Sequence, residues 1–181
     1  MIVKKYTKEY QYLTTNFDCG NYVINNFLKS SNALDPNQGI TYLLLSDDEK
    51  QLIGYYNIEV GRLDCIQNIG SEQSYQFMGG TVHINYLAIH KDFKGKKIAE
   101  VDERNIYLGD ILLDDCEQRI VKLREDVGVS FITLCSTEEG YHLYKMRNSY
   151  EDFEDDMSIF IQERDIDSYK MYKCIDEIVK N

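Results

Sequence analysis

The chain has 181 residues, a length that suits one domain with a sizeable hydrophobic core. Hydrophobic residues make up 43% of it, and no linker-like segment interrupts it, so a mainly disordered chain is excluded and we predict a single domain over residues 1–181. The net charge of −11 opposes general attraction to nucleic acid. No apolar run has the length of a membrane span and the first residues lack a signal-peptide core, so we expect a cytoplasmic protein that does not bind membranes.

The cysteines and histidines indicate neither disulfides nor a metal site. Five cysteines lie far apart in the sequence without a CxxC pair, which is typical of reduced cysteines packed in a core. The three histidines, His83, His90 and His142, show no metal-ligand spacing. We therefore expect no bound metal.

The first half of the chain is predicted to contain three strands and one helix. Apolar and β-branched runs favour the strands, and apolar residues at helical spacing favour the helix. The strands are expected at 2–6, 41–46 and 52–60, the helix at 21–30, and a loop or weak strand at 65–79.

The second half is predicted to alternate strands and helices, which makes the whole chain mixed α/β. Strands are expected at 81–90, 130–135 and 157–161, a short helix at 138–147, and an amphipathic helix at about 165–180. The last helix is predicted from the spacing of its apolar and aromatic residues, Ile166, Tyr169, Tyr172, Ile175 and Val179. We interpret residues 163–181 as an addition to the core domain. We expect it to pack on its own domain, with a dimer contact as the alternative, so the protein is a monomer or a homodimer.

The most informative stretch links the strand at 81–90 to a helix over 110–123. Between them, Lys91–Lys97 places four lysines around Gly95, against the acidic sign of the whole chain. The first amides of a helix have no partners within the helix and, with the helix dipole, favour a bound anion. This pattern predicts a site for a phosphate-bearing small ligand, and the alternative is an ordinary strand–helix connection with solvated lysines.

Four segments in sequence order resemble the GNAT superfamily, the acetyl-CoA-dependent N-acetyltransferases, and in particular its FDCG branch, which includes toxin-like members. They are Phe17-Asp-Cys-Gly-Asn21 with Asn25-Asn-Phe-Leu28, Ile53-Gly-Tyr-Tyr56, Ile84-Asn-Tyr-Leu-Ala-Ile-His90, and Glu139-Gly-Tyr-His-Leu-Tyr144. The resemblance implies a mostly antiparallel central sheet with splayed fourth and fifth strands and flanking helices. It also implies acetyl-CoA as cosubstrate.

The phosphate loop of the family, Q/R-x-x-G-x-G/A, has two possible registers in this chain. The first is Lys94-Gly-Lys-Lys-Ile-Ala99, with lysine at the leading position and at the first glycine. The second is Arg104-Asn-Ile-Tyr-Leu-Gly109, with tyrosine at the first glycine. We prefer the second for the start of the helix, which makes 95–104 an insertion. A side chain at the first glycine would crowd a phosphate in an unchanged loop.

By resemblance, the backbone of Leu87, Ala88 and Ile89 pairs with the pantetheine amides, and Tyr144 is the general acid that protonates the departing thiolate. A phenol with a pKa near 10 can donate a proton to a thiolate with a pKa of about 8.5. The remaining residues expected to bind the coenzyme are Lys94, Gly95, Lys96, Lys97, Arg104, Leu108, Gly109, Asp110 and Ile111. Thr137 stands where many members have asparagine.

No general base is assigned. Glu59 and His83 are candidates, although His83 is better explained as a strand histidine, and the proton can also leave through water. The acidic run 151–156 is interpreted as a solvated turn, which would favour a cationic amine if it borders the acceptor site.

The function predicted is transfer of an acetyl group from acetyl-CoA to a primary amine of a small molecule or peptide. Two alternatives stay open: toxin-type acetylation of aminoacyl-tRNA, which the acidic charge disfavours without excluding tRNA, and a non-catalytic coenzyme-A-binding module. The sequence contains no readable code for the acceptor in the first helix, its following loop or residues 61–80.

Overall fold

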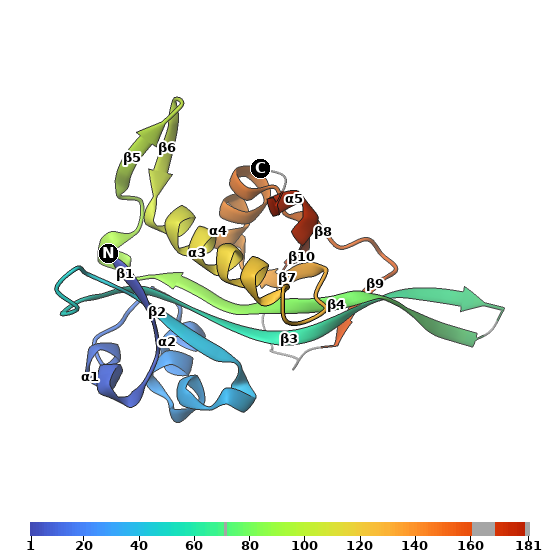
Figure 1. The fold of residues 1–181 in the computed structure, drawn as a ribbon, viewed down its shortest axis with the longest axis horizontal. Coiled ribbons are helices and arrows are strands. Elements are labelled where there is room, and N and C mark those ends of the chain that lie inside the picture. Colours follow the sequence, from blue (N-terminus) through green and yellow to red (C-terminus); the bar gives the residue numbers. More distant parts are fainter. Residues whose placement is uncertain (71, 161–168, 180–181) are drawn as a thin grey trace. The chain divides into compact units, whose positions relative to one another are not determined.

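A computed structural model describes residues 1–70, 72–160 and 169–179. Figure 1 labels its helices and strands in chain order. The chain divides into two compact units. The first unit comprises Met1–Glu59 and Asn85–Cys116, and the second comprises Val60–Ile84 and Glu117–Asn181. Two long strands and one helix, β3 (Leu52–Ile69), β4 (Glu72–Ile89) and α3 (Leu108–Leu123), contribute residues to both. The sequence-based prediction of one domain stays a prediction.

In the first unit, the N-terminal half of the chain builds one edge of a sheet and a layer of short helices. The strands β1 (Ile2–Lys5) and β2 (Ile40–Leu45) pair antiparallel, and β2 pairs antiparallel with β3. The helices are α1 (Gln11–Thr14) and α2 (Tyr22–Lys29), followed by 3₁₀ turns at Ser31–Leu34 and Pro36–Gln38. Asn21 caps α2, because its side-chain oxygen accepts hydrogen bonds from the amides of Val23 and Ile24.

Alternation along β3 places its motif residues on opposite faces of the sheet. Tyr55 donates a hydrogen bond to the carbonyl of Ile24 in α2, with an oxygen–oxygen distance of 2.7 Å. Tyr56 donates to the Asp115 carboxylate in α3 at 2.6 Å. Gly54 lies on the same face as Tyr56, where an added Cβ would come within 3.2 Å of Leu112. The Ile53–Tyr56 motif is therefore where β3 contacts a helix on each side.

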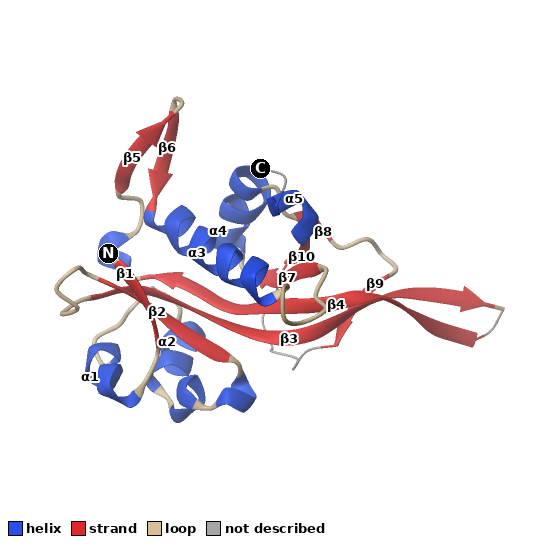
Figure 2. Cartoon of the chain, viewed as in Figure 1, coloured by secondary structure: helices blue, strands red, loops and turns tan. Residues whose placement is uncertain are grey.

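The segment after β4 forms a short 3₁₀ turn, Lys91–Phe93, and then a two-stranded hairpin, drawn as a pair of red arrows in Figure 2. Its strands are β5 (Lys97–Val101) and β6 (Arg104–Tyr107), and the turn residues Asp102 and Glu103 both have positive φ. α3 begins directly after β6. The insertion predicted at 95–104 is thus almost entirely this hairpin.

The second unit contains β7 (Phe131–Ser136), β8 (Glu151–Asp152), β9 (Met157–Phe160) and β10 (Tyr169–Cys174). It also contains α4 (Glu138–His142), a π-helical turn at Leu143–Arg147, and α5 (Ile175–Val179). β10 pairs antiparallel with β7 and β8, and β9 pairs antiparallel with β3. β4 pairs parallel with β7 over Thr81–Ile84 and Phe131–Leu134.

These pairings confirm the predicted fold class, a mixed α/β architecture with a mostly antiparallel sheet and flanking helices, because β4–β7 is the one parallel pairing that the described part of the chain shows.

Of the two alternatives left open for 65–79, a loop and a weak strand, the described residues 65–69 and 72–79 form strand, as extensions of β3 and β4. The prediction of a C-terminal helix over about 165–180 is wrong for most of its described residues. The C-terminal helix is replaced over Tyr169–Cys174 by β10, and only Ile175–Val179 is helical. Ile166 and the rest of 161–168 lie outside the described residues. Met171 is fully buried and pairs with Leu134, so pairing with the edge of β7 overrides the helical spacing of the tyrosines.

Candidate active site

The FDCG segment is held by the carboxylate of Asp18. Its Oδ1 accepts hydrogen bonds from the amide of Gly20 at 2.9 Å and from the side chain of Asn25 at 2.8 Å, and its Oδ2 lies 2.7 Å from Lys91 Nζ. The Lys91 ammonium, with these two donors, holds the pKa of Asp18 far below its usual range. The backbone amide of Lys91 also donates to the Asp18 carbonyl at 2.8 Å. The motif therefore anchors the start of the lysine-rich segment.

The end of β4 and the lysine-rich segment follow one another in the first unit. Ala88 and Ile89 are buried and Leu87 is half-buried. Beyond them, Lys94, Lys96 and Lys97 are exposed, and Gly95 adopts a left-handed conformation with φ of 68°. Lys96 Nζ lies 4.8 Å from the centroid of the Phe93 ring, and Lys97 forms an ion pair with Glu100.

The position at which α3 begins distinguishes between the two possible registers of the phosphate loop. Lys94–Ala99 leads into β5, so no helix N-terminus follows the first register. Arg104–Gly109 leads directly into α3, which begins at Leu108. The second register is therefore compatible with amide donors at a helix start, and the contact with a phosphate stays a prediction.

Asp110 places a carboxylate at this helix start. Its Oδ2 accepts a hydrogen bond from the amide of Tyr107 at 2.9 Å, which is the back-bonding half of a capping box. Its Oδ1 lies 3.9 Å from the guanidinium of Arg104, and the side chain is only 8% exposed. A diphosphate bound to the neighbouring amides would meet this negative charge, and Arg104 partly compensates it.

Tyr144 lies in the second unit, in the π-helical turn after α4. π-helical turns inside helices occur frequently at functional sites. Tyr144 is 6% exposed, and its ring packs edge-to-face against Tyr150 with centroids 5.5 Å apart. The Tyr150 amide donates to the Tyr144 carbonyl at 3.0 Å. Thr137 caps α4 by accepting a hydrogen bond from Gly140, so the helix start is satisfied without asparagine at this position.

A buried ion pair supports the tyrosine pair. Lys173 Nζ lies 3.1 Å and 3.3 Å from the two carboxylate oxygens of Glu117, and these side chains are 11% and 9% exposed. The same ammonium lies 5.3 Å from the centroid of the Tyr150 ring. Charge and aromatic packing thus hold Tyr150 in place beside Tyr144.

The two candidate bases have different surroundings. His83 is 2% exposed, and its Nδ1 lies 3.0 Å from Thr133 Oγ1, as expected for a buried strand histidine with a polar partner. Glu59 is half-buried, and its Oε1 is a buried oxygen without a hydrogen-bond partner in the described part of the chain. Of the two candidate bases, Glu59 is therefore the one with a side-chain acceptor that no described residue occupies.

The acidic run is more structured than a solvated turn. Asp152, in β8, forms an ion pair with Lys145 at 2.9 Å and accepts a hydrogen bond from Tyr141, and mainly the bond from Lys145 holds the pKa of Asp152 below its usual range. The Cys65 thiol donates to Asp156 at 2.9 Å. Within the residues described, no group of acidic, cysteine or histidine side chains could hold a metal ion, and no helix has the length and apolarity needed to cross a membrane.

Sequence reasoning missed the roles of Asp18 and Glu117, and it named Asp110 as a coenzyme-binding residue without anticipating its hydrogen bond to the Tyr107 amide. For Asp18 a signal existed, since an aspartate followed by Asn21 and Asn25 is typical of side-chain caps and turns. For Glu117 there was none, because its partner Lys173 is 56 residues away.

The chain was compared with protein families, curated proteins and solved structures. No protein-family model and no curated protein matches it. Among solved structures, a tyrosine-to-phenylalanine mutant of the toxin AtaT, bound to the C-terminus of the antitoxin AtaR and to acetyl-CoA, is similar with a TM-score of 0.66 at 15% identity, covering 98% of this chain and 94% of that one. The KacTA–DNA complex gives a TM-score of 0.69 at 19% identity, with 99% and 96% covered.

A further structure, described as a bacterial toxin, gives a TM-score of 0.72 at 15% identity, with 99% of this chain and 93% of that chain covered. These similarities extend over nearly the whole length of both chains. The chain therefore has the GNAT-like fold that its sequence predicts, and it shares this fold with the toxin AtaT and with KacT.

Proposed function

We propose that the chain is an acetyl-CoA-dependent N-acetyltransferase of the toxin type, which transfers an acetyl group to the amine of an aminoacyl-tRNA. The observation that supports this most is the nearly full-length likeness to AtaT, a toxin solved with acetyl-CoA. The four motif segments that resemble the FDCG branch provide independent support from the sequence.

The coenzyme would be held mainly by the first unit. The backbone of Leu87–Ile89 would pair with its pantetheine amides, and the amides at the start of α3 would bind its diphosphate. Lys94, Lys96, Lys97 and Arg104 would supply positive charge around these phosphates. When bound, the coenzyme supplies the activated acetyl group as a thioester.

Tyr144 would act as the general acid. Attack of a neutral amine on the thioester carbonyl forms a carbon–nitrogen bond, and collapse of the tetrahedral intermediate breaks the carbon–sulfur bond. The departing thiolate takes the phenolic proton, and the amine loses one proton to water or to a base such as Glu59. The buried position of Tyr144 favours this role, because a phenol shielded from solvent keeps a defined orientation.

A small molecule or peptide amine remains the second candidate acceptor, and it is favoured by the net charge of −11, which opposes binding of a polyanionic tRNA. The likeness to toxins reverses the order in which the sequence alone ranks the two. A toxin of this kind would also require an antitoxin partner, as AtaT has in AtaR.

The test is an acetyl-transfer assay with labelled acetyl-CoA, a pool of aminoacyl-tRNAs and a panel of small amines. We expect label in the tRNA fraction, and a decrease of about 10²- to 10⁴-fold for Tyr144→Phe, the usual contribution of a general acid. Tyr22→Phe, at a tyrosine that is 78% exposed, is the matched control and should keep full activity.

Four outcomes decide between the candidates. Label only in small amines would replace the tRNA acceptor by the second candidate. Binding of acetyl-CoA without transfer to any acceptor would favour the non-catalytic module. Growth that is unaffected by expression of the chain would contradict a toxin, whereas growth arrest that a co-expressed neighbouring small gene relieves would support it.

A further inference from the structure

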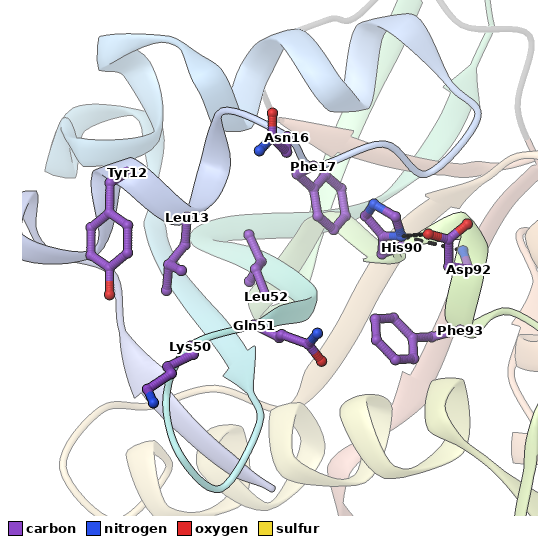
Figure 3. A pocket seen from close by; sticks show the side chains of 10 residues that line it. All are labelled: Tyr12, Leu13, Asn16, Phe17, Lys50, Gln51, Leu52, His90, Asp92 and Phe93. Atoms are coloured by element: carbon purple, nitrogen blue, oxygen red, sulfur yellow. Dashed lines mark hydrogen bonds and ion pairs between the residues drawn. The ribbon is translucent and has the colours of Figure 1, made fainter.

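The first unit contains a pocket of about 460 Å³ between α1, the turn before β3 and the turn after β4, and Figure 3 shows the side chains that line it. Its rings meet at steep angles: Phe17 packs edge-on against His90, and His90 against Phe93, with interplanar angles of 74° and 67°. Its charged side chains, Lys50 and Asp92, have opposite signs. These contacts present neither an open ring face nor one sign of charge, so the pocket does not indicate a class of ligand.

The second unit presents a different surface, the outer part of the hairpin formed by β3 and β4. We call this part, residues 66–69 and 72–78, the arm. β9 pairs with β3 over Arg62–Cys65, and β7 pairs with β4 over Thr81–Ile84. Figures 1 and 2 show both long strands continuing beyond these partners. In the described part of the chain the arm is therefore a ribbon of two strands, and such a ribbon alone is at best marginally stable in water.

The arm is hydrophobic and almost uncharged, although the chain is acidic. Residues 66–78 contain one charged residue, Glu72, and no proline. Tyr75, Phe77 and Met78 are 48%, 60% and 38% exposed. Exposed strand edges in natural proteins usually carry lysine or proline, which prevent another strand from pairing with them. A hydrophobic edge without these residues is a template for a further strand.

The contact between β4 and β7 shows which backbone groups of β4 face the outer edge. The carbonyl of Gly80 accepts a hydrogen bond from the amide of Ser130, directly before β7, at 2.8 Å. Backbone groups alternate in direction along a strand, so those of Met78, Gln76 and Ser74 point to the same side as the Gly80 carbonyl. The ladder between β7 and β4 lies beyond these three residues. They therefore give the arm an edge of three donors and three acceptors.

The charges of the arm decide which partner fits this edge. Arg62, at the base of the arm, places its Nε 2.7 Å and 2.8 Å from the two carboxylate oxygens of buried Asp64 and lies 5.3 Å from the centroid of the Phe77 ring. A cation neutralised in this way does not attract a polyanion such as RNA or an anionic membrane. An uncharged edge fits another uncharged edge, and a second copy of the arm supplies one even though each chain carries a net charge of −11.

The register of a pairing between two copies follows from its symmetry. In an antiparallel pair of identical strands, residues at equal distances from the twofold axis face each other. With the axis at Gln76, Ser74 of one copy faces Met78 of the other, and Tyr75 faces Phe77. The two aromatic residues then form a non-hydrogen-bonded pair, in which side chains approach most closely. Aromatic pairs across strands stabilise a sheet, and the symmetry makes this contact twice.

We propose that the arm is a homodimer interface, in which the outer edges of β4 from two copies pair antiparallel around a twofold axis at Gln76. This pairing joins the two sheets and covers the exposed aromatic side chains of the arm. It places the dimer contact on β4, whereas the sequence suggests residues 163–181 as the alternative to a monomer. The proposal does not depend on acetyl transfer, because association is measured without either substrate.

The first experiment is sedimentation equilibrium of the full chain over a range of concentrations, without ligands. We expect a monomer–dimer equilibrium, with a dissociation constant that Gln76→Lys raises on the order of tenfold or more, because like charges then face each other across the axis. Gln76→Pro should act in the same direction, since it removes the outward amide and keeps the pairing with β3. Asn68→Lys, at an exposed residue of β3 in the same arm, is the matched control and should keep the parent value. Both lysine variants change the net charge equally, so a difference between them does not come from general repulsion.

A cysteine at the axis tests the register. Oxidised glutathione should convert Gln76→Cys into a covalent dimer, because facing Cα atoms of a hydrogen-bonded pair lie about 5.5 Å apart, within the reach of a disulfide. Gln73→Cys should give no more covalent dimer than the parent chain, since its copy lies on the far side of the axis. The parent chain, with its five free cysteines, sets the background.

A chain that stays monomeric at every concentration would overturn the proposal in favour of a partner other than a second copy. A dimer that Gln76→Lys leaves unchanged and that Gln76→Cys does not cross-link would overturn it too, because the contact then lies elsewhere. The cysteine variant keeps the test decisive if Gln76→Pro does not fold. Association without acetyl transfer would refute the proposed function alone, and transfer by a monomer would refute the dimer alone.

Discussion

The two units hold their candidate functional residues by different physical means. In the first unit, the lysine-rich segment is exposed, and two hydrogen bonds between Lys91 and Asp18, which lie 73 residues apart in the sequence, anchor its start. β3 and β4 approach each other closely at Gly54. In the second unit, Tyr144 is buried beside Tyr150, which is supported by a buried ion pair. Substitutions in the first unit should therefore mainly change ligand binding, whereas substitutions around Tyr144 should also change stability.

The strongest test of this contrast is Lys173→Met. Removal of the ammonium leaves the Glu117 carboxylate buried without the partner that lies 3.1 Å away, which typically destabilises a protein by about 3–5 kcal/mol. Chemical denaturation followed by circular dichroism measures the free energy of unfolding. Lys170→Met, at an exposed lysine of the same strand, is the control and should have little effect.

A double variant with Glu117→Gln separates charge from packing. It should recover most of the lost stability, because the amide does not have to be desolvated as an anion. A loss below about 1 kcal/mol for Lys173→Met would show that the pair is solvated, since that is the usual range of surface pairs.

The corresponding test in the first unit is Gly54→Ala. A Cβ here would lie 2.7 Å from both the Ala88 carbonyl oxygen and Ile89 Cδ1, so β3 or β4 must move. Overpacking of this kind usually costs about 1–3 kcal/mol, and the shift of Ala88 and Ile89 should also weaken acetyl-CoA binding. Thermal unfolding and calorimetry measure the two effects. Gly128→Ala has nothing within 4 Å and serves as the control, and unchanged affinity would separate the β4 edge from the coenzyme.

These two regions also differ in how well the sequence predicts them. Local patterns identify β2, the first half of β3, α2 and α3, because hydrophobic periodicity decides those elements within a few turns. The tyrosines of 169–174 have a helical spacing and still form a strand, because the unpaired edge of β7 is a long-range feature. The extension of β3 and β4 over 65–69 and 72–79 is hard to predict for a different reason: its side chains are mostly polar and exposed, so no buried, alternating apolar face marks it as strand.

The residues of the candidate site also differ in how well local sequence patterns predict them. The start of α3 at Leu108 is readable from the apolar spacing that follows it, and it separates the two registers of the phosphate loop. The carboxylate of Asp110 at the amides of this helix depends on a side-chain rotamer that no sequence pattern specifies. For Tyr144 the motif predicts the position on a helix, and its chemical role stays a prediction.

The variant Asp110→Asn tests the effect of the negative charge at the start of α3, where the coenzyme diphosphate is proposed to bind. We expect a small loss of stability, about 0.3–1 kcal/mol, because the negative charge at the start of α3 is removed. The affinity for acetyl-CoA should rise, on the order of fivefold at low salt, since one charge–charge repulsion of about 1 kcal/mol disappears. Calorimetry measures the affinity, and Asp114→Asn, at an exposed aspartate one turn later, is the control. A weaker affinity would mean that the Asp110 carboxylate helps to shape the site and that repulsion is minor.

The smallest effect is expected for Asp18→Asn, and it should depend on pH. Folding lowers the pKa of Asp18, through the Lys91 ammonium and then the Gly20 and Asn25 donors, so the charged carboxylate stabilises the folded state wherever the unfolded chain is also ionised. This stabilisation is fully present above the ordinary aspartate pKa of about 4, and it declines as the pH falls below that value. The variant should therefore unfold at a slightly lower temperature than the parent chain at pH 7, and the difference should shrink toward pH 3. Asp155→Asn, at an exposed aspartate of the second unit, should show no such pH dependence. A difference that stays constant with pH would mean that Asp18 acts through the shape of the turn before α2, and that its charge contributes nothing to holding the lysine-rich segment.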